Sequence, residues 1–108
     1  MMKITLFALF AGLLMLGGCA EESELESTRM SAEQGDAIAQ YNLGVMYDNG
    51  TGVPQDYKEA YAWWSVAKAN GNELAEKNLG IVTKEMTKEQ IADAQSLSTE
   101  IYNRIRGK

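Results

Sequence analysis

The sequence predicts an all-α protein: an α/α superhelix (solenoid) of about two helix-turn-helix repeats that follows a cleaved signal peptide. Residues 35–44 recur as residues 71–80, at an offset of 36, and five of the ten positions are identical. Apolar residues follow at helical spacing, and a glycine-rich turn at residues 49–56 precedes a second helical pattern. A repeat period of about 20 to 50 residues is typical of solenoids, whose units stack to share a core.

The first 18 residues have the composition of a lipoprotein signal peptide. A positive start at Lys3 precedes an uncharged, mostly apolar run at residues 4–16, which is too short to cross a membrane as a helix. The run ends in Leu-Gly-Gly-Cys at residues 16–19, which resembles a bacterial lipobox. We expect cleavage before Cys19 and lipid on this cysteine; an uncleaved anchor with an idle cysteine and ordinary cleavage are the alternatives. Ala20 favours an outer-membrane anchor facing the periplasm, since aspartate there would resemble an inner-membrane retention signal.

Residues 19–30 are predicted to be the lipidated cysteine and an acidic tether, and residues 31–108 the repeat domain. Residues 21–28 hold four glutamates and one apolar side chain, so they cannot bury enough surface to order themselves. A divalent-cation site is the alternative, but neighbouring carboxylates repel one another and favour a solvated linker. Residues 29–34 are then the last turn or two of a lead-in helix, which ends at Gly35.

The first helix of the first repeat is expected to begin after Asp36, a residue type that caps helices through its side-chain oxygen. Its apolar residues form one stripe at i, i+4, i+7 and i+8: Ala39, Leu43, Met46 and Tyr47. We expect Gly44, beside the stripe, to admit another helix closely, because an unpacked glycine costs a helix about 1 kcal/mol relative to alanine. The helix is expected to end near Gly50, since Pro54 prevents its continuation.

The second helix is predicted to begin at Asp56, with Glu59 three residues on as a variant of the capping box. It mixes small and very large side chains, which suits interdigitating helices: Ala60, Trp63, Trp64 and Ala67. Adjacent tryptophans on a helix point about 100° apart, so they cannot form one flat platform for a sugar. We therefore expect at least one of them to lie in the core.

The second repeat begins with Gly71, which is expected to end the preceding helix, and Asn72, which is expected to cap the next one, as Gly35 and Asp36 do in the first repeat. The apolar stripe recurs at Ala75, Leu79, Val82 and Met86. A full capping box from Thr87 to Gln90 then opens a last, longer helix. One face of that helix is apolar: Ile91, Ala94, Leu97 or Ser98, Ile101 and Ile105. Its carboxyl end carries basic residues where the helix dipole favours cations: Arg104, Arg106 and Lys108.

These motifs resemble the Sel-one-like repeat family, which is related to tetratricopeptide repeats. The resemblance covers about residues 32–102 and rests on three features: Gly-Asp-x-x-Ala-x-x-Asn-Leu-Gly-x-x-Tyr from Gly35, the Gly-x-Gly-Val-Pro loop at residues 50–54, and the closing segment at residues 86–95. The second repeat lacks that loop and has Thr83 in place of tyrosine, as in a terminal, capping repeat. The family implies a right-handed α/α superhelix that serves as a scaffold for protein contacts, without naming a partner.

The residue inventory argues against catalysis. The chain has no histidine and a single cysteine, so an ordinary zinc site has no ligands and an intrachain disulfide has no second thiol. No spacing singles out a serine–lysine or carboxylate pair, and we expect no enzymatic activity, metal or cofactor. Acidic residues outnumber basic ones 15 to 10, which favours a basic partner over nucleic acid.

We therefore expect a lipid-anchored scaffold that binds another envelope protein or peptide. One alternative is a structural or self-associating component of the envelope. Another is an accessory protein that binds glycan or peptidoglycan through its aromatic residues.

A second stripe on the first repeat helix is the candidate partner-binding surface: Ile38, Tyr41 and Val45, at i, i+3 and i+7. Its counterparts in the second repeat are Leu74, Lys77 and Ile81. In related superhelices the first helix of each pair lines the concave face, which implies a groove for a peptide or helix. The alternative is that the aliphatic members pack between successive repeats. Tyr41 and Lys77 are the stronger candidates, because their polar tips seek water or a partner.

Overall fold

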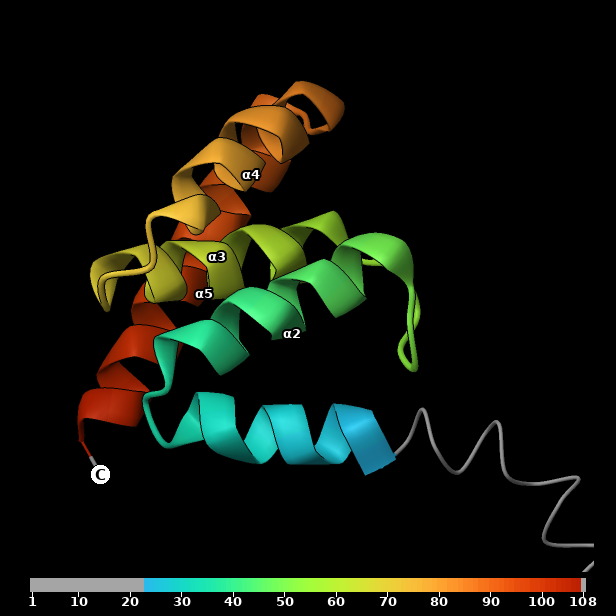
Figure 1. Ribbon diagram of the computed structural model, residues 1–108. Coiled ribbons are helices and arrows are strands. Elements are labelled where there is room, and N and C mark those ends of the chain that lie inside the picture. Colours follow the sequence, from blue (N-terminus) through green and yellow to red (C-terminus); the bar gives the residue numbers. More distant parts are fainter. Residues whose placement is uncertain (1–22, 108) are drawn as a thin grey trace, which may run out of the picture.

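The computed structural model describes residues 23–107, and all regular elements in this range are helical (Figure 1). A leading helix over residues 23–33 comes first. It is followed by α2 (Ala37–Asn49), α3 (Tyr57–Ala69), α4 (Leu74–Val82), a 3-10 turn (Thr83–Glu85) and α5 (Lys88–Arg106). The predicted all-α fold of about two helix-turn-helix repeats is confirmed. The predicted signal peptide and the lipidation of Cys19 lie outside the described residues.

The two repeats differ in how their helices pack. The helices α2 and α3 form an antiparallel pair, with the leading helix beside α2, and α4 packs mainly against α3 (Figure 1). The long helix α5 packs against α3, and its contacts with α4 are few. Within residues 23–107, none of the helices combines the length and apolar character needed to span a membrane.

The helix boundaries follow the predicted caps. The Asp36 carboxylate accepts the backbone N–H groups of Ile38 and Ala39, at 2.9 and 3.2 Å, and Gly50 ends α2 in a left-handed conformation. Asp56 caps α3 in the same way. Before α4, the Asn72 side chain accepts the N–H of Ala75 at 3.2 Å. The predicted box at the start of α5 is complete, because Thr87 and Gln90 exchange side-chain to backbone hydrogen bonds.

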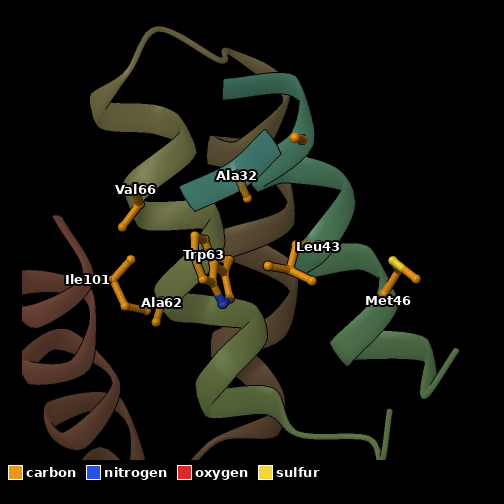
Figure 2. Close-up of a cluster of buried hydrophobic side chains, with 8 residues drawn as sticks. Ala32, Leu43, Met46, Ala62, Trp63, Val66 and Ile101 are labelled. Carbon is orange, nitrogen blue, oxygen red and sulfur yellow. The ribbon is translucent and has the colours of Figure 1, made fainter. Parts of the chain in front are cut away.

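Two clusters of buried side chains form the core. The first joins the leading helix, α2, α3 and α5 around Trp63, whose ring lies between Leu43 and Ile101 (Figure 2). The second joins α3, α4 and α5 around Trp64, with Ala75 and Val82 among its members. Both tryptophans are buried, so the prediction that at least one lies in the core is confirmed. This pair therefore offers no exposed platform to a sugar.

Gly44 provides the close approach that the sequence predicted. A Cβ atom built on Gly44 would lie 2.5 Å from Trp64 Cδ1 and 2.9 Å from Trp64 Cε2. The indole Nε1 also donates to the Tyr41 carbonyl oxygen at 3.0 Å, which fixes the ring against α2. Because Gly44 has no side chain, the Trp64 ring can occupy the space beside it.

The predicted acidic tether is wrong for residues 23–30, because they belong to the leading helix. Leu25 packs against the first core cluster, and Ala32 is fully buried within it. Arg104 of α5 donates to both carboxylate oxygens of Glu33, at 2.6 and 3.3 Å. These tertiary contacts order a segment whose own composition predicts a solvated linker.

A buried amide links the leading helix to both helices of the first repeat. The Gln40 side chain is fully buried; its Nε2 donates to the Ala32 carbonyl oxygen at 3.0 Å, and its Oε1 accepts from Asn70 Nδ2 at 2.9 Å. Both ends of the amide are therefore satisfied, as burial requires. The link fixes the end of the leading helix against α2 and the end of α3.

Candidate interaction surface

Among the described residues, three of the four exposed large apolar side chains lie on α2 and α4, and the fourth, Met30, lies on the leading helix. Ile38 is 68% exposed, Leu74 62% and Ile81 55%, whereas large aliphatic residues usually lie inside. These three belong to the predicted second stripe. Each of the three side chains is more than half exposed to solvent, which argues against packing between repeats as their role.

Tyr41 and Val45 have a different role from Ile38. Both are half-buried and pack against the second core cluster. The Tyr41 hydroxyl accepts a hydrogen bond from Asn78 Nδ2 of α4 at 3.1 Å. Packing between repeats therefore describes Tyr41 and Val45, and the hydroxyl of Tyr41 already has a partner within the chain.

Two open pockets lie along the α2/α4 surface. One, of about 270 Å³, is lined by Tyr41, Val45, Asp48, Trp64, Asn78, Ile81 and Val82. The other, of about 380 Å³, is lined by Ala37, Ile38, Asn70, Gly71, Asn72, Glu73 and Leu74. Each pocket has one carboxylate and no basic residue in its lining. Sequence reasoning did not single out Asp48 or Glu73, because only the tertiary packing of α4 beside α2 and α3 places them at these pockets.

Lys77 is exposed on α4 between Leu74 and Ile81. It lines neither pocket, so the two residues predicted as the strongest contacts, Tyr41 and Lys77, are not equivalent. Tyr41 joins the two repeats, whereas Lys77 faces solvent. Tyr41 and Lys77 occupy equivalent positions in the two repeats, but Tyr41 is half-buried between helices and Lys77 is exposed.

Among the described residues, one carboxyl group has a clearly shifted pKa, that of Glu59 on α3, away from this surface. Burial raises the pKa of the Glu59 carboxyl above its ordinary value of 4.5, and the neighbouring Asp56 carboxylate adds to the shift. A hydrogen bond from the Trp63 side chain and the charges of Arg29 and Arg104 oppose it. Trp63 belongs to the first core cluster, so the shift follows from the packing of the helices around Glu59. In the part of the chain that the structure describes, no three acidic, cysteine or histidine side chains are grouped to hold a metal ion.

The fold and this surface define a class of protein, the helical-repeat scaffold. The Sel1 repeat family model matches residues 37–72. A crystal structure of a protective antigen of uropathogenic Escherichia coli, described as displaying an SLR fold, is similar with a TM-score of 0.70 and 33% identity, over 81% of this chain and 21% of that one. The chain is a Sel1-like repeat protein.

A curated relative is a fungal protein, the chitin synthase regulator SKT5 of Malassezia restricta. It is 33% identical over 85 residues, which are 75% of this chain and 6% of that protein. This chain thus spans a small part of both relatives. Sel1 repeats generally mediate contacts between proteins.

Proposed function

We propose that this protein is a lipid-anchored scaffold that binds another protein or peptide of the bacterial cell envelope through the α2/α4 surface. The observation that carries the proposal is the exposure of Ile38, Leu74 and Ile81 on the first helices of successive repeats. Burying apolar surface is the main favourable contribution to protein association. Exposed apolar residues gathered on one side of a polar protein mark a site of interaction.

The two pockets give this surface places for individual partner side chains. Binding energy usually concentrates in a few side chains that fill such hollows. The carboxylates of Asp48 and Glu73 lie at the pockets, where they favour a partner segment with apolar residues and positive charge beside them. This agrees with the net charge of −5, which favours a basic partner.

The membrane anchor in the proposal rests on the sequence. The Leu-Gly-Gly-Cys motif after a short apolar run supports cleavage before Cys19 and lipid on that residue, and Ala20 supports an outer-membrane location facing the periplasm. Several acyl chains hold a protein firmly where one chain binds marginally. Cys19→Ala should abolish palmitate labelling and leave the leader uncleaved. Palmitate uptake by the variant would contradict the anchor.

Co-purification tests the binding surface. A tagged full chain that carries Ile38→Ser and Leu74→Ser should lose its envelope partner, because both variants remove exposed apolar contacts. Its thermal transition should stay close to that of the parent, since neither side chain is buried. A control with Lys88→Ser and Glu100→Ser on exposed positions of α5 should retain the partner. Equal retention by both double variants would contradict the proposed surface.

A further inference from the structure

The repeat offset relates one edge of α2 to one edge of α4. Tyr41, Gly44 and Val45 on α2 correspond to Lys77, Gly80 and Ile81 on α4, a set that we call the α4 edge. In the first repeat each of these three positions contacts another helix. Trp64 of α3 lies on Gly44, Asn78 of α4 donates to the Tyr41 hydroxyl, and Val45 packs on the second core cluster.

The α4 edge is open. Ile81 is 55% exposed, Lys77 is exposed, and a Cβ atom built on Gly80 would meet no atom within 4 Å. The cause lies in α5, which packs against α3 and places Glu100, the counterpart of Trp64, in solvent. The second repeat therefore keeps the glycine of the first repeat, but no side chain of the described residues lies on it.

An open edge of this kind is unusual in a solenoid, because each repeat generally packs against its neighbours. Terminal repeats are generally capped by a polar outer face, which keeps the stack soluble. Here the outer side of α4 keeps exposed Leu74 and Ile81 and an unpacked glycine, and glycine in a helix interior lowers stability unless a contact compensates. Within the described residues nothing supplies that contact.

We propose that the α4 edge binds an amphipathic helix of a different protein. The occupant is a helix because two helices, α3 and α4, cover the equivalent edge of α2. Lys77 stands in place of Tyr41, so the partner helix carries a carboxylate where α4 carries Asn78. Four positions later it carries an aliphatic residue, as α4 carries Val82, to lie against Ile81. The inference rests on the proposed function and specifies the partner's chemistry at this edge.

A second copy of this chain is not the occupant in this mode. The residues of α4 that cover α2 and α3 are already engaged within the chain: Ala75 and Val82 lie in the second core cluster, and Asn78 is bonded to Tyr41. Another copy cannot present these side chains without unfolding its own second repeat. The α4 helix of a second copy is therefore excluded, and we assign the bound helix to another protein.

A synthetic helix tests the inference directly. The probe is a peptide of residues 71–86 carrying Asn78→Glu, held helical by a lactam between its Glu73 and Lys77 side chains, because short helices are marginal in water. The matched control peptide carries Asn78→Lys. Each is titrated into the full chain, ¹⁵N-labelled and held in zwitterionic lipid nanodiscs, with empty nanodiscs as the blank.

The glutamate peptide should shift the amide signals of Lys77, Gly80 and Ile81. Lys77→Glu in the full chain should weaken binding of the glutamate peptide by about tenfold or more, because two negative charges then face each other. The same substitution should strengthen binding of the lysine peptide, whose positive charge then faces a negative one. Absence of shifts at the α4 edge, or an affinity unchanged by Lys77→Glu, would overturn the inference.

The outcome is separable from that of the proposed function. Shifts centred on Ile38 and Leu74 with an unaffected α4 edge would overturn this inference and support binding at the part of the α2/α4 surface around Ile38 and Leu74. If the variant with Ile38→Ser and Leu74→Ser still retained its cellular partner, that result would count against Ile38 and Leu74 as the binding site. It would leave binding of the peptide at the α4 edge unaffected.

Discussion

Gly44 and Gly80 occupy the same position in the two repeats and have opposite surroundings. Gly44→Ala would place a Cβ atom 2.5 Å from Trp64 Cδ1, and we expect it to destabilise the fold by about 1 to 3 kcal/mol. Gly80→Ala meets open space and should stabilise the fold by up to about 1 kcal/mol through helix propensity. Urea unfolding followed by circular dichroism compares the two. Changes of the same sign would show that the repeats pack alike at this position.

Glu59 provides a prediction about pH. The pKa of Glu59 in the folded state is raised above 4.5, so the folded state binds the proton more tightly than the unfolded state. The free energy of unfolding therefore falls as the pH rises from 4.5 through the raised pKa of the folded state. Glu59→Gln removes the ionised form and keeps an oxygen for the Trp63 hydrogen bond. Thermal melts should show the variant at least as stable as the parent at neutral pH, without the parent's loss of stability above pH 4.5. Glu100→Gln, on an exposed residue, is the control and should leave the slope unchanged.

At the residue scale, the sequence predicted the caps and the role of Gly44 well, because these depend on neighbours along one helix. It could not separate Ile38 from Tyr41 and Val45. All three share one stripe, and only the path of α4 covers the latter two. Exposure of a stripe residue depends on the angle between helices, which periodicity does not encode.

The leading helix can be tested by a single proline. Ser27 is exposed, so Ser27→Ala should change stability by less than about 0.5 kcal/mol. Ser27→Pro removes a backbone hydrogen bond inside the helix over residues 23–33 and should cost about 3 kcal/mol. The difference in urea midpoint between the two variants measures the helix. Equal midpoints would support the tether that the composition of residues 21–28 predicts.

At the element scale, the four repeat helices could be predicted because each carries its own periodicity and caps. The leading helix could not, since residues 21–28 contain one apolar residue, Leu25, among four glutamates. Its order depends on partners distant in sequence, chiefly Arg104 and the first core cluster. The packing of α5 on α3 likewise depends on tertiary contacts that the repeat pattern leaves open.

For the whole molecule we predict one cooperative unfolding transition. The two core clusters share α3, where Trp63 and Trp64 are adjacent, so neither cluster can open without disturbing the other. Leu43→Ala in the first cluster should cost about 2 to 5 kcal/mol. It should lower hydrogen-exchange protection in α4 as much as in α2. Protection that falls in α2 alone would show that the repeats unfold separately.

The central claim, a scaffold that binds its partner through α2 and α4, is tested most directly by photo-crosslinking in cells. A photoreactive residue is placed in the full chain at Ile38 or Leu74, with Lys88 and Glu100 of α5 as exposed controls. We predict one discrete crosslinked protein from Ile38 and Leu74 and none from the two control positions. No adduct from Ile38 and Leu74, or equal adducts from all four positions, would contradict the claim.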